Sequence, residues 1–330
     1  MANGPESEQS SAFGRFIEDL PNSLSLSYYD TLPLDNWIEW FVKDFLVPNF
    51  RPFFQAIQWP VDQVLTNLEA FLQWIPMLLF VLVAALFAWR VAGKNIAIFT
   101  LVSLLFIDLI GMWNPTMTTF AMVLTAVIFC TIVGVPMGIA AARNDRFATG
   151  IRPVLDIMQT IPPFVYLVPI VMLFGVGLVP GVIATIIFAL PPIIRFTNLG
   201  IRQVQAEMVE AGFAFGATRR QVLWDIQVPL ALRTIMAGLN QTLMLALSMV
   251  VIAALIGAGG LGETVYTGLG RLDVGRAAIG GIGIVLLAIV MDRITQAMGD
   301  GGSERKEHWT FTGALKRVFM RSRQAADERQ

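Results

Sequence analysis

The sequence contains a series of long apolar runs, several of which are long enough to cross a lipid bilayer. The hydrocarbon core of a bilayer is about 30 Å thick, and a helix needs about 20 residues to span it. Hydrophobic residues make up 55% of the 330 residues and charged residues 14%, so the soluble globular and disordered classes are poor fits. We therefore expect an all-α integral membrane protein with about seven transmembrane helices, at residues 75–90, 96–113, 118–142, 161–174, 179–194, 242–257 and 276–297.

The residues that usually carry catalysis or bind metals are scarce. The chain has one cysteine, Cys130, inside an apolar run, and one histidine, His308, in a polar stretch near the C-terminus. No intrachain disulfide or cysteine-based metal site can be built from one cysteine. A lone histidine offers no second ligand for a shared metal and no partners for a catalytic triad. We expect no cofactor and no metal site, and no enzymatic activity of the chain itself.

Composition divides the chain into four regions. Residues 1–36 are polar and acidic, without the basic and then apolar pattern of a signal peptide, and we expect a disordered tail. Residues 37–74 alternate apolar and polar side chains at helical spacing, which predicts an amphipathic interfacial segment. Its tryptophans suit a membrane surface, although an aromatic ligand site remains an alternative. Residues 75–298 form the transmembrane domain, and residues 299–330 form a basic tail.

Positive charge predicts the orientation in the membrane. An odd number of spans places the two ends on opposite sides, and short cytoplasmic loops carry an excess of Lys and Arg. With the N-terminus outside, the inner segments contain 18 of the 23 Lys and Arg residues and the outer segments five. We therefore expect a multi-pass membrane protein with its N-terminus outside and its C-terminus in the cytoplasm.

Small residues and prolines mark two special features of the spans. Gly134 and Gly138 form a small-xxx-small pair, which predicts close packing of neighbouring helices. Prolines at 162, 163, 169, 191 and 192 are expected to break or kink the fourth and fifth spans beside a cavity or pathway. From these positions we select candidate pathway residues, with ordinary helix packing as the alternative for each: Pro162, Pro163, Tyr166 and Ser248.

The segment of residues 196–241, between the fifth and sixth predicted spans, is too polar to lie in lipid. Residues 207–215 suit a short helix that Gly216 can end, because glycine accepts a positive φ angle after a helix C-terminus. Residues 218–221, Thr-Arg-Arg-Gln, form a capping box that opens a second helix. Pro229 is expected to prevent simple continuation of that helix. The pattern predicts a projecting helix-turn-helix, which is either a docking site or a passive structural loop.

This segment resembles the EAA motif of ABC importer permeases. The motif reads E-A-A-x3-G-x9-I-x-L-P, and the chain keeps every gap, with Gly212 in place of the second alanine and Val228 in place of the leucine. In that family the motif forms a coupling helix that sits in a cleft of the ATP-binding subunit. The resemblance implies a docking role for these residues: Glu210, Ala211, Gly212, Gly216, Arg219, Arg220, Ile226 and Pro229.

A wider stretch, from about residue 33 to 298, resembles ProW-type permeases of proline/glycine betaine ABC importers. The matching segments include residues 158–174, 186–195 and 240–253. The resemblance implies a type I permease fold and alternating access for quaternary-ammonium osmolytes. It also implies the partners: a second permease copy, two ATP-binding subunits that bind ATP and Mg, and an external substrate-binding protein. Membrane lipid is a further partner, and no nucleic acid is expected.

Other functions fit the residues less well. Gly257, Gly259 and Gly262 satisfy G-x-G-x-x-G, but they follow a membrane span, so we expect a flexible outer loop rather than a dinucleotide site. No P-loop motif occurs in the sequence, so a partner must hydrolyse ATP. Within the same family the cargo could instead be choline, carnitine, trimethylamine oxide or another methylated osmolyte. An ion-coupled secondary transporter, and a membrane scaffold or intramembrane enzyme, remain as remote alternatives.

Overall fold

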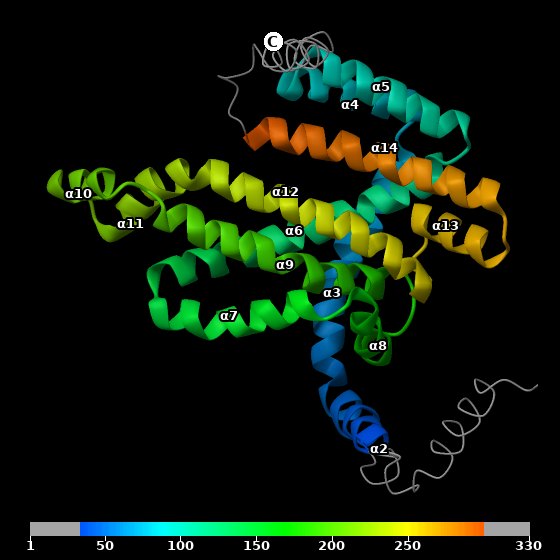
Figure 1. Ribbon diagram of the computed structural model, residues 1–330, viewed down its shortest axis with the longest axis horizontal. Helices are drawn as coiled ribbons and strands as arrows, with labels where there is room; N and C mark the ends of the chain where they lie inside the picture. Colours follow the sequence, from blue (N-terminus) through cyan, green and yellow to red (C-terminus); the bar gives the residue numbers. More distant parts are fainter. Residues whose placement is uncertain (1–33, 300–330) are drawn as a thin grey trace, which may run out of the picture. The chain divides into compact units, whose positions relative to one another are not determined.

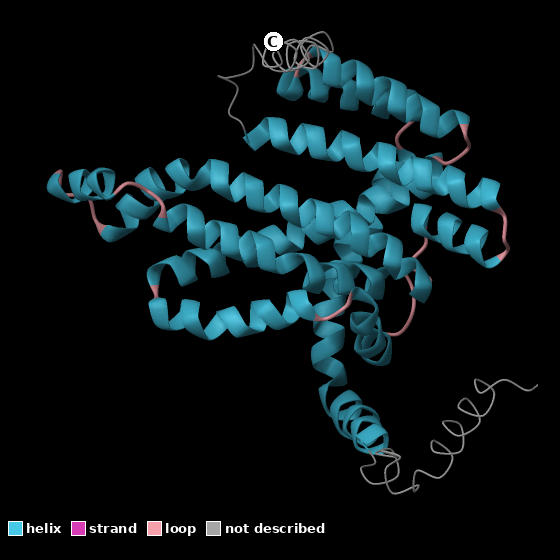
Figure 2. Ribbon diagram, in the orientation of Figure 1, coloured by secondary structure: helices cyan, strands magenta, loops and turns pink. Residues whose placement is uncertain are grey.

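The computed structural model describes residues 34–299, and the described residues contain helices and connecting loops but no strand (Figure 2). The chain divides after Pro52 into two compact units, which are treated separately. Most of the two predicted tails, 1–36 and 299–330, lies outside the described residues, including His308, whereas residues 34–36 belong to a helix rather than to a disordered tail. In the first unit, α2 (Leu34–Glu39) continues into a π-helical stretch, η2 (Trp40–Leu46), and then into the start of α3 (Val47–Trp74).

The segment predicted to be interfacial is helical throughout. In the second unit, α3 buries Val61, Leu65 and Leu72, which recur at helical spacing on one face. Large apolar side chains on other faces of the helices between residues 34 and 74 are exposed, among them Trp37, Trp40, Trp59 and Trp74. The helix is therefore amphipathic, as its sequence predicts.

Four described helices are long and apolar enough to cross a membrane alone: α6 (Trp113–Arg143), α9 (Leu178–Arg202), the continuous helical stretch Arg219–Ile256 that contains α12 (Val228–Ala253), and α14 (Val274–Gly299). Two bent pairs raise the number to six if each makes one span. They join α3 to α4 (Met77–Ala92) at 105° and α7 (Asp145–Thr160) to α8 (Pro163–Phe174) at 101°.

All seven predicted spans are helices in the structure, and six of them belong to these four helices and two pairs. The remaining predicted span is α5 (Lys94–Leu109), which has 16 residues and therefore a length of about 24 Å at 1.5 Å per residue. This length is shorter than the hydrocarbon core. The helical membrane class is confirmed, and by helix length and composition the described part holds four to six spans rather than seven.

The centre of the second unit is a packed trio of α6, α9 and α12 (Figure 1). Glycines let these helices approach closely. A Cβ atom on Gly134 would lie 2.3 Å from Ile193 of α9, and one on Gly138 would lie 2.5 Å from Thr197. Between α12 and α9, a Cβ atom on Gly238 would lie 2.5 Å from Phe196. The predicted close packing at Gly134 and Gly138 is confirmed, and its partner is α9.

A helical hairpin of α4 and α5 packs on the outside of this centre, against α14 (Figure 1). Its own small core consists of Val81, Leu104 and Ile107, which are buried. The hairpin turn is Gly93, whose φ of 92° is a backbone conformation that favours glycine. The hairpin is thus joined to the rest of the second unit mainly through one helix, α14.

The prolines behave differently from one another. Pro162 and Pro163 lie at the 101° bend between α7 and α8, so the predicted break at these two residues is confirmed. Pro169 lies inside α8, and Pro191 and Pro192 lie inside α9, and both helices continue past them. The side chains of Pro191 and Pro192 are buried among neighbouring helices. Protein rather than lipid therefore surrounds the backbone carbonyls that receive no N–H donor from these prolines.

The glycine-rich segment after α12 is more regular than predicted. Gly257 and Gly259 have positive φ angles, but Gly260 begins a helix, α13 (Gly260–Gly270). Leu261 is fully buried, and its backbone N–H donates a hydrogen bond of 2.9 Å to the Thr119 hydroxyl of α6. The expectation of a loop therefore holds only for the residues before Gly260, because the N-terminus of α13 packs on α6.

Candidate functional site: the α10–η3 hairpin

The helix-turn-helix predicted between the fifth and sixth spans is present, at one end of α9 and α12 (Figure 1). Its first helix, α10 (Ala206–Ala214), ends in a Schellman motif at Gly216, whose φ is 82°. The N–H of Gly216 donates to the carbonyl of Phe213 at 2.9 Å, and the N–H of Ala217 donates to the carbonyl of Gly212 at 3.1 Å. The predicted role of Gly216 in ending the helix is thus confirmed.

The second helix opens with the predicted capping box. Thr218 accepts a hydrogen bond from the N–H of Gln221, and the Gln221 side chain accepts one from the N–H of Thr218 at 2.9 Å. The short helix α11 (Arg219–Gln221) passes into a π-helical turn, η3 (Val222–Gln227), and then into α12. The second half of the hairpin and the sixth predicted span are therefore joined in one continuous helical rod.

The prediction that Pro229 prevents continuation of the helix is wrong. Residues 219–256 are helical without a break. Just before Pro229, the N–H of Val228 donates to the carbonyl of Leu223, five residues earlier. This wider π turn relieves the contact that a proline ring makes with the preceding helical turn, so the helix continues past Pro229.

The two arms of the hairpin pack tightly at Gly212. A Cβ atom at Gly212 would lie 2.5 Å from Cδ1 of Ile226 and 3.3 Å from Cγ2 of Val222. Gly212, Val222 and Leu223 are buried, and Ile226 is half-buried. The glycine that replaces the second alanine of the motif therefore lets η3 lie directly against α10. Gly212 and Ile226 hold the hairpin together rather than forming its outer surface.

Two arginines make contacts at the base of the hairpin, one to the hairpin itself and one between the neighbouring helices. Arg143, at the end of α6, donates to the backbone carbonyl of Arg219 at 3.2 Å. Arg202, at the end of α9, donates to the carbonyl of Ala141 at 2.8 Å and forms an ion pair with Asp145 at 2.7 Å. An arginine side chain that donates to a carbonyl in the last turn of a helix is favourable, because that end of the helix carries partial negative charge. The hairpin is thus hydrogen-bonded to the end of α6, and Arg202 joins the adjoining end of α9 to α6 and α7.

A cavity of about 540 Å³ lies at the base of the hairpin, between its two arms and the ends of α6 and α9. Its lining is mixed, with Arg143, Arg219 and Gln227 beside Val209 and Phe213. An open space there gives the hairpin a concave side in addition to its exposed tip.

The outer surface of the hairpin is unusually apolar for exposed positions. Phe215, in the turn, is 93% exposed, and Met208, Phe213 and Trp224 are about half exposed. Most of the residues that the motif resemblance selects are exposed beside them: Glu210, Ala211, Gly216, Arg219, Arg220 and Pro229. A cluster of exposed aromatic and apolar side chains with charged neighbours is typical of a protein interface.

The candidate pathway residues do not form one site. Pro162 and Pro163 make the bend between α7 and α8, and the Tyr166 hydroxyl donates to the carbonyl of Met158 in the same bend. Ser248 is exposed on α12, and its hydroxyl donates to the carbonyl of Met244 at 3.1 Å.

Apart from these residues, Arg195 and Asp156 form an ion pair of 2.6 Å. Among the described residues, no group of His, Cys, Asp or Glu side chains is arranged to hold a metal ion.

Two helices were missed by the sequence analysis, α7 beside the base of the hairpin and α13 at the opposite end of α12 (Figure 1). Helix α7 begins after Asn144, whose side chain accepts hydrogen bonds from the N–H groups of Arg146 and Phe147. This N-cap could have been recognised, because asparagine is a preferred residue at that position. Helix α13 has buried residues at Leu261, Thr264 and Gly268, the spacing of one helical face, but its glycines conceal the pattern.

A bundle of long apolar helices with an exposed, apolar helical hairpin at one end is the architecture of a membrane protein that presents a surface outside the lipid. The family model of the binding-protein-dependent transport system inner membrane component matches residues 134–300. The chain belongs to this family and is a membrane permease subunit of an ABC importer. It is 54% identical, over 91% of its length and 86% of the relative, to the glycine betaine/proline betaine transport system permease protein ProW of Escherichia coli K12.

Other comparisons agree. The chain is 47% identical to the glycine betaine transport system permease protein OpuAB of Bacillus subtilis 168, over 80% of this chain and 94% of that one. An inward-facing structure of the MetNI methionine ABC transporter matches with a TM-score of 0.50 at 22% identity, over 57% of this chain and 93% of that one. The match to the MetNI structure shows that the fold is that of a type I importer permease.

Proposed function

We propose that this chain is the translocating subunit of an ATP-driven importer of quaternary-ammonium osmolytes such as glycine betaine and proline betaine. The proposal of this cargo rests on the high identity to the ProW and OpuAB permeases, which are named for betaines. Choline, carnitine, trimethylamine oxide and other methylated osmolytes are alternative cargoes of the same chemical class. Alternating access then requires two global states of the permease with different exposure of the cargo.

The α10–η3 hairpin is the proposed docking site for the ATP-binding subunit. The observation that carries this proposal is the combination of an exposed apolar tip, at Phe215, with a base that is hydrogen-bonded to the end of α6 and continuous with α12. A passive loop needs neither feature. In this proposal the partner binds ATP and Mg and pushes on the hairpin, and η3 transmits the displacement into α12 as one helical rod.

The orientation and the assembly follow from the same proposal. A hairpin that meets a soluble ATPase lies in the cytoplasm, which agrees with the excess of Lys and Arg expected on that side. The C-terminus is then inside, because two spans, α12 and α14, follow the hairpin, and an odd total number of spans places the N-terminus outside. Two copies of the permease, two ATP-binding subunits and one external binding protein form the proposed complex. Residues 37–74 lie at the outer membrane surface in this arrangement, where their exposed tryptophans meet the interface.

The decisive experiment measures ATP-dependent uptake of radiolabelled glycine betaine into proteoliposomes that contain this chain, its ATPase and its binding protein. Glu210→Lys is tested beside the unchanged chain, because Glu210 is exposed on α10 and its replacement reverses a charge on the proposed contact surface. We expect uptake in the unchanged chain, and loss of both uptake and ATPase association in the variant. If betaine is not taken up and another methylated amine stimulates the ATPase activity, the chain remains a permease and that amine replaces betaine as the proposed cargo.

A matched charge reversal controls for general damage. Glu263→Lys alters another exposed glutamate, on α13, at the opposite end of α12 from the hairpin (Figure 1). Association of the ATPase subunit with this variant should be unchanged. Equal loss of association in both variants would contradict a docking role of the hairpin.

A further inference from the structure

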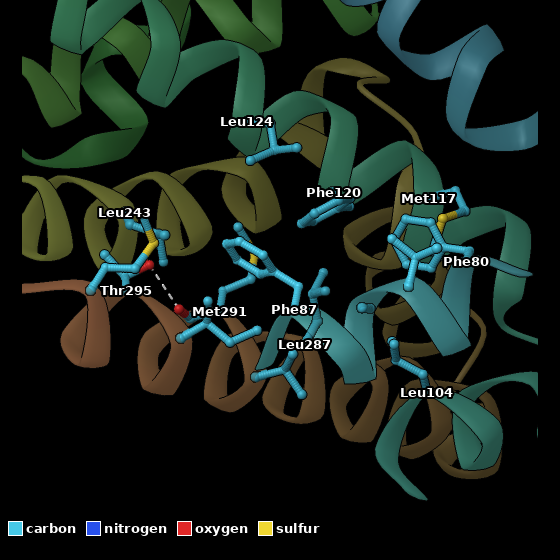
Figure 3. Close-up of a pocket in the computed structure, with 15 residues that line it drawn as sticks. Phe80, Phe87, Leu104, Met117, Phe120, Leu124, Leu243, Leu287, Met291 and Thr295 are labelled. Carbon is cyan, nitrogen blue, oxygen red and sulfur yellow. Dashed lines mark hydrogen bonds between the residues drawn. The ribbon is translucent and has the colours of Figure 1, made fainter. Parts of the chain in front are cut away.

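An apolar crevice lies where the α4–α5 hairpin meets α6, α12 and α14 (Figure 3). Its volume is about 340 Å³. Apolar cavities of only about 150 Å³ already stay dry and bind molecules of the size of benzene. Among the residues that line the crevice, Thr295 alone has a polar side chain, and its hydroxyl is satisfied by the carbonyl of Met291 at 2.8 Å. Water therefore has no hydrogen-bond partner to occupy the space, and an apolar occupant is favoured.

The crevice has a buried floor and an open mouth. Leu287 and Met291 of α14 are only 3% and 6% exposed, and they form the floor together with Leu104 and Met117. The mouth is formed by side chains that are about half exposed, including Val83 and Phe87 of α4 and Met298 of α14. One side is closed by the packed rings of Phe80, Phe120 and Trp113.

The mouth continues onto a surface that faces lipid in a membrane permease. Leu79, Leu82 and Leu86 of α4 are exposed beside it, and α4 carries no charged residue before Arg90. The surrounding solvent at this depth is hydrocarbon, and phospholipid tails are its flexible apolar molecules. A polar ligand would leave its own hydrogen-bonding groups unsatisfied among these side chains.

We propose that this crevice binds one phospholipid acyl chain, which wedges between the α4–α5 hairpin and α14. The tail enters beside Val83 and reaches Leu287 and Met291. Its floor also includes Leu243 of α12, the helix that begins at the α10–η3 hairpin. The bound chain thus fills a packing defect between the outer hairpin and the central helices.

The test uses a phospholipid that carries a diazirine midway along one acyl chain, in proteoliposomes of the full-length chain with its ATPase subunit. Irradiation and peptide mapping locate the adducts. Bulk lipid can label exposed Leu82 and Leu86, whereas only a chain inside the crevice can reach Leu287 and Met291. We expect adducts at both sets of residues.

Two substitutions on α4 separate the crevice from the general lipid surface. Val83 and Leu82 are both 55% exposed, but only Val83 lines the crevice. Val83→Trp should remove the adducts at Leu287 and Met291, whereas Leu82→Trp should leave them. Ala84→Phe, which fills the crevice from its wall, should act like Val83→Trp.

Two outcomes would overturn the proposal: adducts confined to exposed residues in the unchanged chain, or equal crevice labelling in both tryptophan variants. The thermal unfolding midpoint of each variant in detergent identifies misfolding, so that loss of adducts in an unfolded variant is not counted. Because Val83 and Leu82 have the same exposure, a folding defect should affect both tryptophan variants alike.

Discussion

A Cβ atom on Gly212 would lie 2.5 Å from Cδ1 of Ile226, far inside a normal carbon–carbon contact. The two arms of the docking hairpin are therefore fitted to each other at a position where the ABC permease motif has alanine. Only the end of a flexible side chain blocks the space, so Ile226 can move, but it must leave its position against α10 to do so.

Gly212→Ala is expected to loosen the hairpin. Overpacking costs about 1–3 kcal/mol, and the higher helix propensity of alanine offsets at most about 1 kcal/mol of this cost. Hydrogen exchange of the α10 amides should accelerate, and uptake should fall. Adding Ile226→Val removes the Cδ1 atom and should restore both properties. Additive effects of the two substitutions in a double-mutant cycle would contradict direct contact between the residues.

Phe215→Ser should weaken docking without weakening the fold. Phe215 is 93% exposed, so its side chain contributes little to packing within the chain. If it is an anchor of the interface, its loss costs about 2 kcal/mol or more of binding free energy to the ATPase. Titration of the purified ATPase against permease in nanodiscs measures this change. Leu272→Ser, at a residue that is 89% exposed between α13 and α14, should leave the affinity unchanged.

Gly138→Ala should destabilise the whole bundle. Its new Cβ atom would lie 2.5 Å from Cβ of Thr197 and 2.8 Å from the backbone carbonyl oxygen of Ile194, and a backbone atom cannot rotate away. We expect a loss of about 1–3 kcal/mol and a lower thermal unfolding midpoint. Gly150→Ala is the control, because no atom lies within 4 Å of that Cβ position in α7. A stable Gly138→Ala variant would show that α6 and α9 separate easily.

Tyr166→Phe tests whether the bend between α7 and α8 needs the tyrosine hydroxyl. Pro162 has no N–H, so it cannot donate to the carbonyl of Met158 four residues earlier, and Tyr166 donates in its place. Removal of the hydroxyl leaves that carbonyl without its donor, which costs about 1–3 kcal/mol. Thermal unfolding should detect this loss, whereas exposed Ser248→Ala should be nearly neutral. Unchanged stability with abolished uptake would instead support a role of Tyr166 in the pathway.

Local features of the hairpin could be predicted well because they depend on neighbouring residues alone. A positive φ angle requires glycine at 216, and the Thr218–Gln221 capping box is complete within four residues. The membrane class follows from the apolar runs for the same reason, since each run must satisfy its own backbone groups in lipid. The π turn before Pro229 could not be predicted, because η3 packs directly against α10, and the sequence does not show that the two arms of the hairpin meet there.

The sequence by itself determined that this chain is a helical membrane protein with a capped helix-turn-helix between two apolar spans. Only the tertiary structure decided which surfaces are internal and which are available to partners. Gly212 and Gly138 look alike in the sequence, yet one brings the hairpin arms together and the other joins α6 to α9. The physical reason is that a glycine permits close approach without specifying the approaching residue. That choice depends on how helices distant in the chain pack together.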